Sequence, residues 1–408
     1  MQVAQFSDPN TEQSLAQYFY NEAWARIASS KQTLGHYTES DAIAAIQLIN
    51  YAILSRGTTD WRSMLEILCE WLNQTGLAVD EDPKYTMSTM TNSRQFALKT
   101  TMVGLGTSGP CQSCADFCSS QWMDIISSMT LMKPPKFLGL YRRLFNNGGN
   151  FWAATGHSDN YELRIHSLTG CPEDVMLGIA EVSALAHWKI REQRNGCLSM
   201  RELIRRGDAI EQQLRTHPEP KSFAEVDQAP MHPNLPGTNV DYVGSPSMLS
   251  SSQCANMPNQ FPSEETRRMV ASLFRETAVL YLHTVLSDSV PGTCLAILLA
   301  SAITHPLSTG VPEITASVDA IVQLITRLPP SEVDRSLVFP LCLTGCMTDN
   351  RARRELLKGR LQAQDENLGN ILQARALMEA VWQRRDVGGG AINWREIMHN
   401  DGLNLLLL

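Results

Sequence analysis

The 408-residue sequence is poor in charge and has no excess of basic residues. Charged side chains make up only 19% of it, and 34 Lys and Arg against 42 Asp and Glu give a formal net charge of -8. Nucleic-acid binding draws much of its affinity from neutralising phosphates, so this balance argues against a stand-alone DNA-binding protein. Basic residues recur only as scattered doublets, typical of solvated helix faces: Arg142-Arg143, Arg205-Arg206, Arg267-Arg268, Arg353-Arg354 and Arg384-Arg385.

The features of secreted and membrane proteins are also absent. The N-terminus lacks a basic region followed by an apolar core, and the longest apolar run, Cys294 to Ile303, is too short to span a bilayer. Ten cysteines in a chain of this length do not suggest a disulfide framework, and Cys69 and Cys342 lie in apolar company. We therefore expect a soluble intracellular protein in a reducing compartment.

The alternation of apolar and polar residues that marks strands is nearly absent, whereas helical spacing of apolar residues recurs along the chain. The sequence therefore predicts an all-α fold, a large bundle of antiparallel helical hairpins. Helical patterns cover residues 15–27, 43–53, 61–72, 122–132, 137–145, 172–214, 269–285, 295–303, 314–328, 351–360, 368–385 and 393–398. A serine cap at Ser331 predicts the start of one more helix, and the apolar run 337–346 follows it.

Residues 1–408 are expected to form a single helical domain, interrupted by one long loop at 217–262. Eight of the 20 prolines fall in that stretch, together with a serine-rich run. Such a composition buries too little apolar surface to offset the entropy of ordering the chain. We therefore expect a flexible, Pro/Ser-rich loop there.

Two motifs point to ligands, and in both the plain structural interpretation is favoured. Residues 104–109 match the dinucleotide-binding fingerprint, but no strand–helix–strand context surrounds these glycines, so a glycine loop is expected. Cys111, Cys114 and Cys118 have the spacing of zinc ligands. His157 and His166 are too remote in sequence to be claimed as a fourth ligand, so thiols at a helix start are expected.

No catalytic constellation is visible. His187 and His283 lie on apolar helical patterns, where histidine is more often a satisfied core side chain than a base. The sequence contains no metalloprotease, nucleophile-elbow or phosphate-binding motif. We therefore assign no catalytic, DNA-binding, cofactor-binding or metal-ligating residue, and we expect no cofactor and no enzymatic activity.

The last eighty or so residues carry the most specific order of motifs. These are Phe339-Pro340-Leu341 running to Gly345-Cys346, the pair Val381-Trp382, and Trp394-Arg395-Glu396-Ile397-Met398 before a leucine tail; upstream lie Thr169-Gly170-Cys171-Pro172 and Leu280-Tyr281-Leu282. This ordered set resembles the fungal-specific transcription factor domain, the helical region that follows the binuclear zinc cluster in Zn2Cys6 regulators. The zinc cluster itself, which needs six cysteines among basic residues, is absent.

The resemblance implies the regulatory region of a nuclear regulator of RNA polymerase II transcription. It implies partners among transcription proteins, a homodimer or heterodimer, or a small effector, with no direct DNA contact from these residues. The chain would be either a fragment of a longer regulator or a relative that lacks the zinc cluster. A helical scaffold or adaptor is the alternative, and an all-α enzyme with an unrecognised pocket is less favoured.

Overall fold

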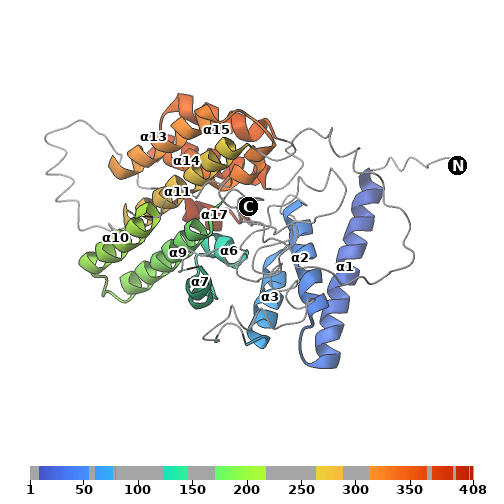
Figure 1. The fold of residues 1–408 in the computed structure, drawn as a ribbon. Helices are drawn as coiled ribbons and strands as arrows, with labels where there is room; N and C mark the ends of the chain where they lie inside the picture. Colours follow the sequence, from blue (N-terminus) through green and yellow to red (C-terminus); the bar gives the residue numbers. More distant parts are fainter. Residues whose placement is uncertain are drawn as a thin grey trace, which may run out of the picture.

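The computed structural model describes residues 9–54, 60–76, 79, 123–145, 171–216, 263–287, 312–364, 370–388, 392–403 and 405–407. Every regular element in these ranges is a helix, so the predicted all-α class is confirmed (Figure 1). The expected loop at 217–262, the helix at 295–303, the glycines at 104–109 and the cysteine segment 111–118 lie outside the described residues.

The helices are named as in Figure 1, with their bounds. They are α1 (Pro9–Leu34), α2 (Glu39–Leu54), α3 (Arg62–Gln74), α6 (Met123–Leu131), α7 (Leu138–Phe145), α9 (Glu173–Arg194), α10 (Met200–Thr216), α11 (Glu264–Ser287), α13 (Pro312–Arg327), the 3-10 helix η5 (Glu332–Leu337), α14 (Val338–Met347), α15 (Arg351–Gln362), α16 (Ile371–Gly388) and α17 (Trp394–Asn400).

Helices α1, α2 and α3 form one group at an end of the molecule, with α2 packed against both others (Figure 1). The start of α2 is fixed by a reciprocal cap, because Thr38 Oγ1 accepts from the Asp41 backbone N–H and Asp41 Oδ2 accepts from that of Thr38. Helix α3 buries the stripe that its spacing predicts, from Met64 to Leu72. The apolar pattern of α1 is only partly a core pattern, because Tyr18 and Phe19 are exposed.

The carboxylate of Asp124 joins α6 to α7. It accepts hydrogen bonds from the backbone N–H groups of Lys136 and Phe137, both at 3.1 Å, and from the Tyr141 hydroxyl at 3.0 Å. An acidic side chain at this end of α7 also complements the helix dipole. Burial raises the pKa of Asp124 above its usual value, and burial next to Asp124 raises the pKa of Cys69 on α3 to about 12. The junction thus fastens α6 to the start of α7.

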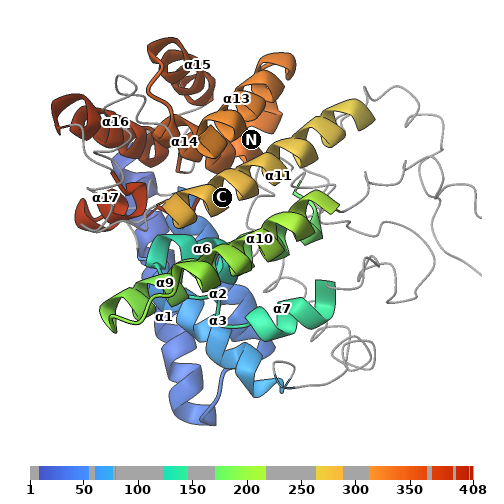
Figure 2. The ribbon, with the colours of Figure 1, turned by 90° about the vertical axis from the view of Figure 1, so that its left-hand side faces the viewer.

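Helix α11 is the central helix of the remaining body. It runs between α9 and α10 on one side and α13 and α14 on the other, and packs against all four (Figure 2). Residues 277–285 are buried without interruption. A helix that is buried on every side has no solvent face, so its polar side chains need internal partners.

The C-terminal segment departs from the prediction at its start. Ser331 makes no side-chain cap, and the helix that starts after it is a short 3-10 helix, η5, which α14 follows. Helix α14 begins at Val338, so Pro340 falls in the first turn, where a missing N–H costs no hydrogen bond. The whole of α14 from Val338 to Cys346 is buried.

The leucine tail is part of the core. Leu405, Leu406 and Leu407 are all at most 2% exposed. The backbone carbonyl of Leu405 accepts from Thr130 Oγ1 on α6 at 2.6 Å, and that of Leu406 accepts from the Asn370 amide just before α16. The tail therefore connects α6 to the start of α16, which lie far apart in sequence.

Helices α14 and α16 approach closely at Gly345. Its carbonyl accepts from the indole N–H of Trp382 at 2.8 Å, and a Cβ at Gly345 would collide with the side chain of Met378, which is itself fully buried. On α15, by contrast, a Cβ at Gly359 would meet nothing within 4 Å. A methyl group added at Gly345 would therefore collide with α16, whereas one added at Gly359 would point into open space.

We predict that Gly345→Ala lowers the free energy of unfolding by about 1–3 kcal/mol, because the added methyl overpacks the α14–α16 contact. The matched variant Gly359→Ala should raise it by about 0.5–1 kcal/mol, because alanine loses less backbone entropy in a helix. Denaturant titration followed by circular dichroism measures both. Equal changes in the two variants would contradict this packing.

Candidate functional site

The arginine doublets of the sequence are largely held by acidic residues of the same chain. Four of the five doublets contain ion-paired arginines, in the pairs Arg142–Glu181, Arg205–Glu202, Arg206–Glu202, Arg353–Asp319, Arg354–Asp386, Arg384–Asp401 and Arg385–Asp349. An acid beside each arginine cancels much of the local positive potential. The seven paired arginines therefore present less positive potential than unpaired side chains would.

Helix α15 is the most basic of these segments, and its charges face three neighbouring elements. Arg353 pairs with Asp319 of α13. Arg354 pairs with Asp386 of α16 at 2.9 Å, and Lys358 pairs with Glu379, also of α16, at 2.8 Å. The positive charge of α15 thus stabilises its packing within the bundle.

Arg360, on the same helix, makes a buried ion pair with Asp334 of η5. Its Nε donates to Asp334 Oδ2 at 2.8 Å, and its second terminal nitrogen donates to Oδ1 at 2.5 Å. The remaining terminal nitrogen donates to the carbonyls of Ile325 and Leu328, where α13 ends. One guanidinium therefore fixes the end of α13, η5 and α15. Burial raises the pKa of Asp334, and Arg360 opposes that rise.

A second polar centre lies around Tyr281, in the buried middle of α11. The Tyr281 hydroxyl lies 3.4 Å from Ser183 Oγ of α9 and accepts from the Arg395 guanidinium of α17 at 3.2 Å. Its ring meets Phe339 and Trp394 edge-on. All five side chains are buried. The centre joins four helices, and its hydroxyl-to-guanidinium contacts carry no nucleophile–base pair of the kind covalent catalysis needs.

The histidines singled out by the sequence occupy structural positions. His283 lies on α11 with its Nε2 3.8 Å from Glu211 Oε1 of α10. The pKa of His187 is lowered by burial and by the nearby Arg191 and Arg194, so its charged form is disfavoured. In the described part of the chain no group of three or more His, Cys, Asp or Glu could hold a metal ion. His157 and His166 lie outside it.

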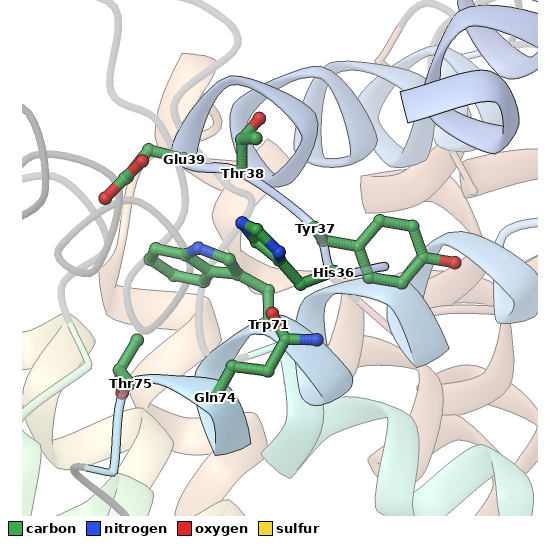
Figure 3. A pocket seen from close by; sticks show the side chains of 7 residues that line it. All are labelled: His36, Tyr37, Thr38, Glu39, Trp71, Gln74 and Thr75. Atoms are coloured by element: carbon green, nitrogen blue, oxygen red, sulfur yellow. The ribbon is translucent and has the colours of Figure 1, made fainter. Parts of the chain in front are cut away.

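A pocket of about 310 Å³ opens where the α1–α2 connection meets the end of α3 (Figure 3). It is lined by His36, Tyr37, Thr38 and Glu39 from the connection and the start of α2, and by Trp71, Gln74 and Thr75 from α3. Its volume lies at the lower end of the range of small-molecule sites. This pocket is the candidate functional site.

The pocket follows from how the two helix ends are built. Gly35 ends α1 with a positive φ of 76°, a conformation that favours glycine, and so turns the chain directly into His36 and Tyr37. The capped start of α2 then places Thr38 and Glu39 opposite the last turn of α3 (Figure 3). Trp71, at 3% exposed, is the most buried side chain of the lining, and His36 is exposed.

The sequence did not reveal this site. Its pattern assigned Trp71 to the apolar stripe of α3, which is correct, and singled out Thr38 only as a helix cap, not as part of a pocket. The only local signal is a glycine followed by two aromatic rings between capped helices. The contact of that connection with α3 depends on how the helices pack.

No helix in the described ranges is long and apolar enough to cross a membrane.

Comparison with known proteins identifies the family. A sequence profile described as the fungal specific transcription factor domain matches residues 2–408. The chain belongs to this family. The resemblance noted from the C-terminal motifs is thereby confirmed over nearly the whole domain, together with the expected class of function, fungal transcription regulation.

Curated relatives of the domain are fungal transcription regulators. The trichothecene biosynthesis transcription regulator of Fusarium sporotrichioides is 22% identical over 249 residues, which are 60% of this chain and 46% of that protein. The ustiloxin B cluster transcription factor of Aspergillus flavus is 24% identical over 250 residues, 59% of this chain and 35% of that protein. A transcription factor of Pestalotiopsis microspora is 22% identical over 268 residues, which are 65% of this chain and 36% of that protein.

The domain therefore spans less than half the length of these relatives. No solved structure matches it.

We predict that Arg360→Met destabilises the domain by about 3–5 kcal/mol at neutral pH, because it leaves the Asp334 carboxylate buried without a counter-charge. The double variant Asp334→Leu with Arg360→Met should recover most of that loss. Denaturant titration of the three proteins measures the difference. A loss as large in the double variant as in the single one would contradict the assignment.

The loss in Arg360→Met should also shrink as the pH falls from 7 toward 5. The folded-state pKa of Asp334 is already raised by burial, and removal of Arg360 raises it further. An acid with a raised folded pKa binds more protons when folded, so stability falls as the pH rises above the unfolded value and returns as the pH falls. The same titration, repeated at the two pH values, tests the sign.

Proposed function

We propose that this domain is the regulatory region of a fungal transcription factor that controls RNA polymerase II transcription in the nucleus. It acts through partner proteins or an effector, and it neither binds DNA nor catalyses a reaction itself. The observation that carries the proposal is the family match over residues 2–408, taken with the pairing of the basic doublets to acids of the same chain.

The names of two relatives suggest what such a regulator controls. One regulates trichothecene biosynthesis, and another is the transcription factor of the ustiloxin B cluster. We propose by analogy that this domain takes part in controlling the genes of one biosynthetic pathway. The DNA contact would then come from another segment or from a partner protein. Dimerisation and the identity of partners stay predictions.

The absence of DNA binding is tested by a mobility-shift assay with the isolated chain. With a net charge of -8 and seven of the doublet arginines paired with acids, we expect no sequence-specific shift at moderate salt, where phosphate contacts control affinity. A nonspecific lysine-rich peptide serves as the positive control for retardation. A shift that survives moderate salt and depends on the DNA sequence would refute this part of the proposal.

The regulatory role is tested by joining the domain to an unrelated DNA-binding domain in a fungal reporter strain. We expect the fusion to change reporter transcription by at least severalfold. Arg360→Met should abolish the change, because activity requires the folded bundle, while Gly359→Ala should preserve it. Immunoblots verify that the three fusion proteins are present in equal amounts.

A fusion with no effect on transcription would refute the regulatory role. An effect that survives Arg360→Met would assign the activity to an unfolded segment and not to the helical domain.

A further inference from the structure

We infer that the pocket between the α1–α2 connection and α3 binds a small, uncharged aromatic compound that carries a hydrogen-bond acceptor and a donor. The inference deepens the proposed function and rests on it, because it takes this ligand to be the effector that the regulator senses. Three features of the described residues carry it: an indole N–H without a partner in the protein, an imidazole with a fixed tautomer, and a lining without lysine or arginine.

The first feature is the indole N–H of Trp71. The side chain is 3% exposed, and no described residue accepts a hydrogen bond from its Nε1. In Figure 3 this nitrogen lies on the edge of the ring toward Thr38, on the side of the pocket. Indole can only donate, and this Nε1 is not one of the fully buried, unpartnered side-chain atoms of the described residues, so it remains open to the pocket. A ligand with an acceptor atom would satisfy it.

The second feature is the proton position on His36. Its Nδ1 lies 2.9 Å from the backbone carbonyl oxygen of Leu34. A carbonyl can only accept, so Nδ1 carries the proton, and in the neutral ring Nε2 is left as an acceptor. The pocket thus offers one donor, on Trp71, and one acceptor, on His36. A ligand that satisfies both must carry the complementary pair.

The third feature is the character of the remaining lining. None of its seven residues is Lys or Arg, and Glu39 adds a carboxylate at one edge, so an anionic ligand is disfavoured. Lys31 stacks over the Tyr37 ring at 4.6 Å but is held by Glu70 at 2.6 Å. The rings of Trp71 and His36, adjacent in Figure 3, offer aromatic faces to a flat molecule. A volume of about 310 Å³ suits one or two rings.

The inference is tested with carbostyril, a two-ring lactam whose carbonyl and N–H are adjacent. Its N-methyl derivative has nearly the same shape and acceptor but no donor. Binding is followed through the indole N–H resonances of the nitrogen-labelled chain, which has eight tryptophans. Trp71→Phe identifies the Trp71 resonance by its loss.

We expect carbostyril to shift the Trp71 resonance selectively, with a dissociation constant on the order of 1 mM for a ligand of this size. The methylated compound should bind the wild-type chain about three- to tenfold more weakly, the usual weight of one hydrogen bond. His36→Ala should bind both compounds equally, because the residue that distinguishes them is gone. Trp24→Phe, outside the pocket, should behave as wild type.

No selective shift of the Trp71 resonance at the solubility limit, or equal binding of the two compounds to the wild-type chain, would overturn the inference. So would a His36→Ala chain that still discriminates between them. His36 is exposed, so this variant tests the site even where Trp71→Phe loses stability. Binding is measured on the isolated chain, so an absence of ligand binding would not affect the reporter result. A failed reporter with binding intact would refute only the regulatory role.

Discussion

The complete burial of residues 277–285 of α11 is the constraint on which the rest of the body depends. Nine successive residues, 277–285, lie in the interior, so every polar group among them must find a partner inside the protein. Tyr281 finds Ser183 and Arg395, and the hydroxyls of Thr277 and Thr284 return to carbonyls of their own helix. These bonds fix how α9 and α17 sit against α11, and with them the order of the bundle.

Ion pairs also hold helices of that body together, most of them near its surface. The basic side chains of α15 hold α13, η5 and α16 in place, and Arg360 does so from the interior, where it also satisfies the last carbonyls around α13. Exposed ion pairs of this kind add little stability one at a time. Together these pairs join Arg353, Arg354 and Arg360 of α15 to acids of the same chain.

Several elements were predictable from the residues in detail. The Thr38–Asp41 cap, the stripe of α3, the positive-φ Gly196 between α9 and α10, and Asn393 as the cap of α17 all follow local rules. The helices predicted in these segments are present, but their spacing did not show which residues are buried. Tyr18 and Phe19 have helical spacing yet face solvent, and Leu372 of α16 is also exposed. Spacing places residues on one face of a helix, but it does not say whether another element covers that face.

The sequence by itself determined the fold class, most helix positions and the family, because periodicity, caps and an ordered set of C-terminal motifs are local properties of the chain. Only the tertiary structure decided that the leucine tail bridges α6 and α16, that most arginine doublets meet acids, and that His36 and Trp71 line one pocket. Each of these depends on residues brought together from distant parts of the chain. Such contacts are set by the packing of whole helices, which no local spacing encodes.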